Sequence, residues 1–116
     1  MSTARMRRVD EAMRQVLGDA LAQELKDPRI GFVTVTDVKT SPDLRHARVY
    51  VSVLGPEAEQ EATLAGLQSA HGFLQGRVAA ELRLKRTPEL QFELDHTAER
   101  AARLERLLAD EDPERP

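Results

Sequence analysis

The residues of this sequence best suited to a chemical task are cations gathered in one short stretch. Positions 77 to 86 contain four basic side chains and a single acidic one, Glu81. The four are Arg77, Arg83, Lys85 and Arg86. Guanidinium and ammonium groups bind phosphates through charge and hydrogen bonds, so the cluster indicates phosphate or nucleic-acid binding. Taken alone, a cluster of this kind is more often a solvated helix face.

Two further sets of arginines extend this interpretation. Arg5, Arg7 and Arg8 open the chain, and we expect them to form a flexible basic arm before the first helix. Arg45 and Arg48 stand at the start of a predicted strand. Both sets rank below the main cluster as phosphate ligands, because exposed arginines also serve solubility.

The overall charge of -3 argues weakly against a nucleic-acid partner until the charges are placed along the chain. Residues 93–116 hold eight acidic side chains against four arginines, so the acidity lies in the C-terminal segment. The rest of the chain is slightly basic. Because local clusters rather than the total charge govern phosphate binding, an RNA partner remains compatible with the composition.

No set of residues suggests catalysis, a cofactor or a metal. The chain has no cysteine, which excludes disulfides and thiolate chemistry and suits a reducing, cytoplasmic setting. The three histidines, His46, His71 and His96, lack the spacing of metal ligands. No Walker loop, nucleophile motif or dinucleotide fingerprint is present. We therefore expect a binding protein rather than an enzyme.

Hydrophobic periodicity predicts the elements that position these cations. Apolar residues recur every three or four positions from Val9 to Leu25, which predicts an amphipathic helix ended by Pro28. Alternating residues predict strands over 31–38 and 46–54. The intervening Thr40-Ser41-Pro42-Asp43 has the residue types of a turn, so the two strands should form an antiparallel hairpin.

The second half of the chain predicts a helical region, a third strand and a last helix, over residues 56–84, 89–95 and 97–108. Three strands with one apolar face each are most economically covered on one side by the helices, which predicts an α+β two-layer sandwich. Residues 1–108 then form one domain, and 109–116 a disordered acidic tail. No run has the length of a membrane span and no export signal is present, so we expect a soluble protein. We expect a monomer, because no large apolar repeat is left once the core is built.

Two glycines interrupt the long helical region. Gly72 and Gly76 each cost roughly 1 kcal/mol relative to alanine inside a helix, so each needs an explanation. Sharp bends concentrate at glycine, which favours a kink at Gly72. For Gly76 we favour close packing of the helix on the sheet.

The segment ELKDPRIGFVTVTDVKTSPDLRHARVYVSVLG, residues 24–55, resembles the ribosome-binding factor A family, which are bacterial assembly factors of the small ribosomal subunit. The resemblance continues through ATLAGLQSAHGFLQGRVAAELRLKRTPEL, residues 62–90, and covers roughly residues 5–108. Its motifs DPRIGFVTVTDV, SPDL and RLKRTPEL occur in the family's order and spacing.

The resemblance implies a type II KH-like fold in which an Ala-x-Gly kink replaces the Gly-x-x-Gly loop of ordinary KH domains. Ala70-His71-Gly72 matches that kink, and no Gly-x-x-Gly occurs in this chain. The kink would aim the basic second half of the helical region at an RNA surface. His71 is more simply a polar cap or an exposed ring than a base-stacking group. Among the four aromatic residues, only Tyr50 is a candidate for an exposed ring, which favours recognition of RNA shape and phosphates.

The resemblance also implies a function. The chain would be a non-enzymatic factor that binds the maturing 30S subunit through 16S rRNA near its 3′ end, assists late processing and is then released, with an assembly GTPase aiding release. Ribosome biogenesis and cold adaptation follow from the same likeness. The alternative is a protein interaction module without a direct RNA role, which uses the open sheet edge or the acidic C-terminal helix.

Overall fold

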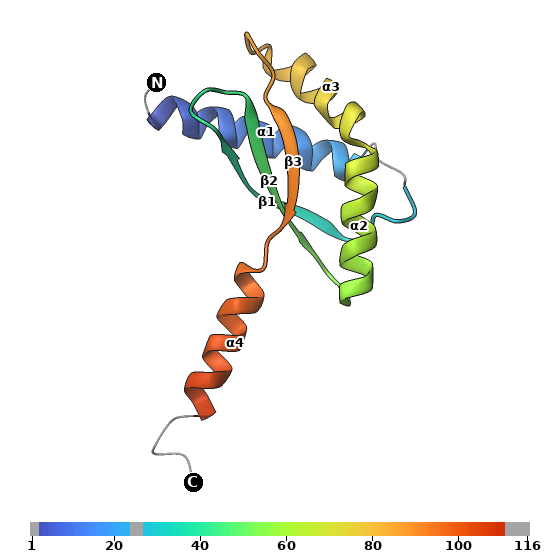
Figure 1. Cartoon of the computed structure of the whole chain (residues 1–116), viewed down its shortest axis with the longest axis vertical. Helices are drawn as coiled ribbons and strands as arrows, with labels where there is room; N and C mark the ends of the chain where they lie inside the picture. Colours follow the sequence, from blue (N-terminus) through green and yellow to red (C-terminus); the bar gives the residue numbers. More distant parts are fainter. Residues whose placement is uncertain (1–2, 24–26, 111–116) are drawn as a thin grey trace.

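The computed structural model describes residues 3–23 and 27–110 of the chain (Figure 1). Its elements are, in order, α1 (Thr3–Gln23), β1 (Val33–Thr40), β2 (His46–Val53), α2 (Glu57–Ser69), α3 (His71–Leu82), β3 (Glu89–Leu94) and α4 (Thr97–Asp110). This is the predicted α+β order, with the long helical region divided into α2 and α3.

The three strands form one open sheet with β2 in the centre. β1 pairs with β2 in antiparallel register, as predicted for the hairpin, and β3 pairs with β2 in parallel register. Thr40 belongs to β1 rather than to the turn. It stands opposite Ala47 of β2 at the end of the ladder. A contact that the sequence does not reveal also holds it: Asp10 Oδ1 of α1 accepts hydrogen bonds from the backbone N–H of Thr40 at 3.0 Å and from its hydroxyl at 2.5 Å.

Helices α1, α2 and α3 cover one face of the sheet and leave the other face open (Figure 1). Alternate residues of β2 supply the middle of the core, and the helices add long apolar side chains above them. The fully buried members include Met13, Leu17, Val49, Val51, Leu67, Leu74 and Val78. Burial of this one apolar face is the main force that holds the two layers together.

The first helix begins earlier than predicted. Arg5, Arg7 and Arg8 lie within α1, so the prediction of a flexible arm is wrong. The apolar periodicity begins only at Val9, which faces the core in part, while the preceding turns are mostly polar and still helical. The predicted end of this helix at Leu25 lies outside the described residues.

The break between α2 and α3 falls at Ala70, the first residue of the predicted kink segment. Its φ of -89° is open to any residue, and Gly72 lies in the first turn of α3. A Cβ added at Gly72 or Gly76 would meet nothing within 4 Å. Close packing therefore does not explain Gly76, and that prediction is wrong. The glycine that packing requires is Gly66 of α2, where a Cβ would lie 2.7 Å from Ile30 Cγ1.

Helix α4 projects away from the sandwich (Figure 1). Its leucines Leu104, Leu107 and Leu108 are between 53% and 60% exposed, so the expectation that the core would absorb every apolar repeat is wrong for this helix. The helix includes Asp110, and the remainder of the predicted tail, residues 111–116, lies outside the described residues. Within the described ranges, no helix has the length and hydrophobicity needed to cross a membrane.

Candidate nucleic-acid interface

One end of the sandwich gathers cations from three segments that are far apart in the sequence. These segments are the start of α1, the turn between β1 and β2, and the loop between α3 and β3. We call this region the basic end, and its cations are Arg5, Arg8, Arg45, Arg83, Lys85 and Arg86, all exposed. The backbone N–H of Glu89, where β3 begins, donates to the carbonyl of Arg45 at 2.8 Å, which joins the loop to the turn.

The cations of the α3–β3 loop were predicted to lie on a helix, and that prediction is wrong. Helix α3 ends at Leu82, and Arg83 takes the left-handed conformation with φ 47° and ψ 41°. A residue in this conformation turns the chain out of the helix, a place where glycine is usual. Lys85 and Arg86 therefore project from a loop rather than from one helix face.

The loop is fastened to the body by Gln75 of α3. Its Nε2 donates to the carbonyl of Pro88 at 2.6 Å, and its Oε1 accepts from the backbone N–H of Leu90 at 3.1 Å. Pro88 itself is fully buried. Because one side chain satisfies two backbone groups, the end of the loop has a defined position relative to α3. Sequence reasoning did not single out Gln75, and no local pattern marks it.

Arg77 differs from the other cations of the predicted cluster. It lies within α3, and its Nη2 is 3.4 Å from Glu81 Oε1. Its side chain is only 32% exposed, so part of it packs against the protein. An ion pair with an acid on the same helix lowers the field that Arg77 presents to a phosphate. Arg77 therefore differs from the three loop cations, Arg83, Lys85 and Arg86, because it is ion-paired and partly buried.

The arginines of α1 point to two sides of the helix. Arg5 and Arg8 line a cleft at the basic end, whereas Arg7 borders a hollow that contains Asp10 and Glu11. Arg5 lies in the first turn, which has no acidic residue. The positive end of the helix dipole makes a cation unfavourable there. The helix dipole therefore does not favour Arg5 at this position.

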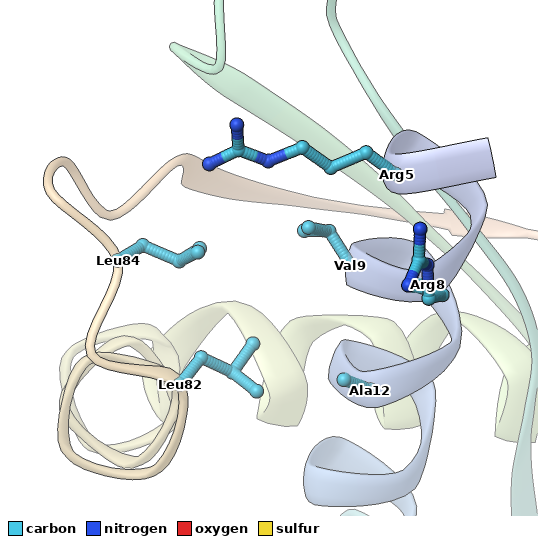
Figure 2. A pocket seen from close by; sticks show the side chains of 6 residues that line it. All are labelled: Arg5, Arg8, Val9, Ala12, Leu82 and Leu84. Carbon is cyan, nitrogen blue, oxygen red and sulfur yellow. The ribbon is translucent and has the colours of Figure 1, made fainter. Parts of the chain in front are cut away.

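The cleft at the basic end has apolar walls and a basic rim (Figure 2). It has a volume of about 490 Å³ and is lined by Arg5, Arg8, Val9, Ala12, Leu82 and Leu84. Figure 2 shows the Arg5 side chain extended over the cleft, toward the side from which Leu84 enters it. Among the residues that the structure describes, none that lines this space is acidic. It can therefore take a ligand that is apolar in one part and anionic in another.

The remaining predicted cations are partly engaged. Arg45 Nε is 3.9 Å from Asp43 Oδ2, in a pair whose members are both well exposed. Arg48 lies on the open face of the sheet, opposite Lys39 of β1 and Gln91 of β3. A hydrogen bond to Tyr50 and the charge of Glu93 raise the pKa of Arg48. Both arginines stay charged, but the acidic side chains beside them weaken the positive field that they present to a phosphate.

The aromatic residues are distributed differently from the prediction. Phe32 is 84% exposed and Phe73 44% exposed, while Tyr50 is half-buried on the open sheet face. Tyr50 is therefore not the only candidate for an exposed ring. His71, in the predicted kink segment, is also half-buried. Among the described residues, no three His, Cys, Asp or Glu side chains come together as a metal site would require.

The antiparallel hairpin, the helix pair broken at Ala70 and the parallel third strand define a domain of the KH-like class. The chain belongs to the ribosome-binding factor A family, whose model matches residues 5–108. This confirms the resemblance found in the sequence and the KH-like fold that it implied.

Solved structures of the family have the same fold. A putative ribosome-binding factor A from Thermotoga maritima is 38% identical, with a TM-score of 0.72 over 80% of this chain and 89% of that one. The crystal structure of ribosome-binding factor A from Thermus thermophilus is 29% identical, with a TM-score of 0.69 over 77% and 93% of the two chains. A homology model of the Thermus thermophilus protein, fitted into a cryo-EM map of a 30S complex, is 30% identical with a TM-score of 0.64 over 76% and 92%.

Proposed function

We propose that this chain is a non-enzymatic assembly factor that binds the maturing 30S subunit through 16S rRNA near its 3′ end. It assists late processing in the cytoplasm and is released afterwards, with the help of an assembly GTPase. The family match over residues 5–108 carries the proposal. Further support comes from the fitted Thermus thermophilus protein, which is described in complex with the 30S subunit.

The basic end is the proposed RNA-binding surface. Arg83, Lys85 and Arg86 would neutralise phosphates from the α3–β3 loop, and Arg5 and Arg8 would do so from α1. The observation that supports this choice is the gathering of exposed cations from three segments around a cleft that no acid lines. Arg7, Arg45, Arg48 and Arg77 have acidic neighbours and would contribute less.

The break at Ala70-His71-Gly72 gives α3 its own direction relative to α2 and so helps to place the loop. Since no Gly-x-x-Gly loop is present to clamp a single strand, we propose that the protein recognises mainly the shape and phosphates of folded RNA. It would act as a monomer.

Co-sedimentation across a salt series tests the proposal. The purified protein is centrifuged with immature small subunits, mature small subunits and large subunits. Selective binding to small subunits, with an affinity that falls steeply as salt rises, is the expected result. Equal binding to all three particles would reduce the RNA contact to nonspecific electrostatics, and absence of binding to any of them would refute the function.

A protein interaction module is the second candidate, and one observation favours it. Leu104, Leu107 and Leu108 of α4 form an exposed apolar stripe of the kind that packs into a groove on another protein. Nuclease treatment separates the two functions, because partners captured through protein contacts survive it. If the ribosomal proteins that co-purify with the chain persist after nuclease treatment, the second candidate gains over the first.

A further inference from the structure

We propose that the cleft between α1 and the end of α3 holds one unpaired base of a folded RNA, between the Arg5 guanidinium and the apolar walls. This inference rests on the proposed function, because it states what the basic end recognises in the RNA beyond phosphate charge.

The walls of the cleft are apolar and come from two distant parts of the chain. Val9 and Ala12 lie one turn apart on α1, and Leu82 and Leu84 lie at and beyond the end of α3. All four remain partly exposed, and Val9, Leu82 and Leu84 also pack against the edge of the core. Phosphate binding alone does not use the apolar surface that they leave open. A planar, largely apolar group can pack against it.

The charges around the cleft favour an anionic ligand. Arg5 and Arg8 form its rim, and Arg83 lies between the two wall leucines in the sequence. Three nearby acids are occupied elsewhere: Asp10 accepts from Thr40, Glu11 pairs with Arg14, and Glu81 pairs with Arg77. A fourth, Glu89 at the start of β3, is exposed and does not line the cleft. A negatively charged ligand therefore meets cations without a competing carboxylate in the cleft.

An unpaired nucleotide combines these two properties. Its base offers a flat apolar face, and the phosphates on either side of it are anionic. Unstacked bases in RNA loops and bulges commonly lie against guanidinium planes, which can replace the aromatic platforms that this cleft lacks. The volume of about 490 Å³ is in the range of sites for small organic ligands.

An acidic peptide with an apolar side chain is the competing occupant. The observations favour RNA, because Val9 and Ala12 lie inside α1, where helical hydrogen bonds already use the backbone groups. The cleft thus offers an extended peptide few backbone partners. The exposed cations of the adjoining loop extend the positive surface beyond the cleft, so successive phosphates of an RNA backbone can each meet a cation.

The test uses the full chain and three RNA hairpins of otherwise equal sequence: one with a single bulged nucleotide, one with an abasic site at the bulge, and one fully paired. Binding is measured by fluorescence anisotropy. The bulged hairpin should bind on the order of tenfold more tightly than the abasic one, which is the usual effect of one stacked base. Equal affinity for the bulged and abasic hairpins would overturn the proposal.

Methyl NMR of the unmodified protein locates the base. Ring currents from the bulged nucleotide should shift the methyl signals of Val9, Leu82 and Leu84, and the abasic hairpin should leave them nearly unchanged. Shifts confined to methyls elsewhere, such as those of Leu104, would overturn the proposal.

Three variants of α1 complete the design. Ala12→Phe fills the cleft and keeps every charge, while Ala22→Phe adds the same ring at an exposed position near the other end of the helix. We call the ratio of the affinities for the bulged and the abasic hairpin the bulge preference. It should fall to about one in Ala12→Phe and persist in Ala22→Phe. Because Ala12→Phe could disturb the packing of α1, Arg5→Gln is measured beside it and should lower the preference severalfold. Persistence of the full preference in folded Ala12→Phe, or in Arg5→Gln, would overturn the proposal.

The same experiments keep this inference separate from the proposed function. If the three hairpins bind equally and small subunits still co-sediment, the cleft proposal fails and the assembly function stands. If neither hairpins nor small subunits bind, the proposed function fails as well. If Ala12→Phe no longer binds an acidic peptide that the unmodified protein binds, but binds RNA as before, the cleft belongs to a protein partner and our assignment is wrong.

Discussion

The two ends of the sheet carry opposite charges for different physical reasons. At the end where β2 finishes, α2 begins with Glu57 and Glu59 in its first turn (Figure 1). These acids complement the positive end of the helix dipole and so stabilise the fold. At the basic end, Arg5 occupies the first turn of α1, where the same dipole opposes it. The helix dipole favours the acids of α2 and opposes the arginine of α1.

A similar contrast holds for backbone conformation. The chain leaves α3 through Arg83 in a left-handed conformation, which costs a residue with a Cβ roughly 1 kcal/mol or more. A charged residue stands where glycine would be more stable. Leu44, in the turn between β1 and β2, also has a positive φ of 60°. What distinguishes Arg83 is that the conformation places an exposed cation in the α3–β3 loop, which agrees with the proposed binding surface.

Charge reversal at the basic end should have the largest effect. Lys85→Glu with Arg86→Glu should lower affinity for small subunits by about 100-fold at 0.1 M salt, because each lost phosphate contact is worth roughly tenfold there. The salt slope should fall by about 2. The matched control, Arg103→Glu with Arg106→Glu in α4, makes the same change in net charge and should bind nearly as the unmodified protein does. Equal losses in both variants would show that only net charge matters.

Arg83→Gly separates binding from stability. The substitution relieves the left-handed conformation, so the free energy of unfolding in urea should rise by about 0.5–1 kcal/mol. Loss of one phosphate contact should at the same time lower subunit affinity roughly tenfold. Arg83→Lys should keep most of the affinity. A variant that is more stable and binds equally well would remove Arg83 from the proposed surface.

At the acidic end, Glu57→Gln with Glu59→Gln should show the opposite pattern. Two favourable charge–dipole interactions are lost, and each is worth typically 0.3–1 kcal/mol, so the midpoint of urea unfolding should decrease. Affinity for small subunits should change by less than about twofold, because the acids lie away from the basic end. A marked gain or loss of affinity would mean that α2 borders the RNA.

Asp95 should give the smallest effect, visible only in acid. Hydrogen bonds from Thr36 and Thr97 lower its pKa from 3.8 to about 2. A carboxyl whose pKa is depressed on folding adds stability above its unfolded pKa, and this stability is lost as the pH falls. Thermal unfolding of the protein should therefore show an Asp95-dependent decline between about pH 4 and pH 2. Asp95→Asn should lose that part of the decline, and an unchanged pH profile would contradict the assignment.

Local periodicity was sufficient to predict the hairpin, the third strand and the covered sheet. Residues such as Val49 and Val51 alternate with polar neighbours, and this pattern depends only on the strand's own geometry. The start of α1 was missed because a helix start with few apolar residues leaves only a weak pattern. The end of α3 was missed because Arg83, rather than glycine, takes the left-handed position.

The site depended on contacts that no local pattern encodes. The cleft exists because Val9 of α1 and Leu82 of α3 come together across more than seventy positions of sequence. Gln75 and Gly66 acquire their roles only when Pro88 and Ile30 pack beside them. The sequence predicted the same role for Arg77 and Arg83. The structure distinguishes them, since Arg77 lies within α3 and pairs with Glu81, whereas Arg83 ends the helix in a left-handed conformation.

The most direct test of the central claim is directed cleavage of rRNA from the two ends of the molecule. The chain has no cysteine, so single cysteines can carry an iron chelate that releases hydroxyl radicals. Glu89→Cys places the chelate at the basic end, and Ala58→Cys places it at the start of α2; both positions are exposed. On small subunits, cleavage of 16S rRNA should be strong and localised from position 89 and weak from position 58. Stronger cleavage from position 58 would contradict the account, because the acidic end would then face the RNA.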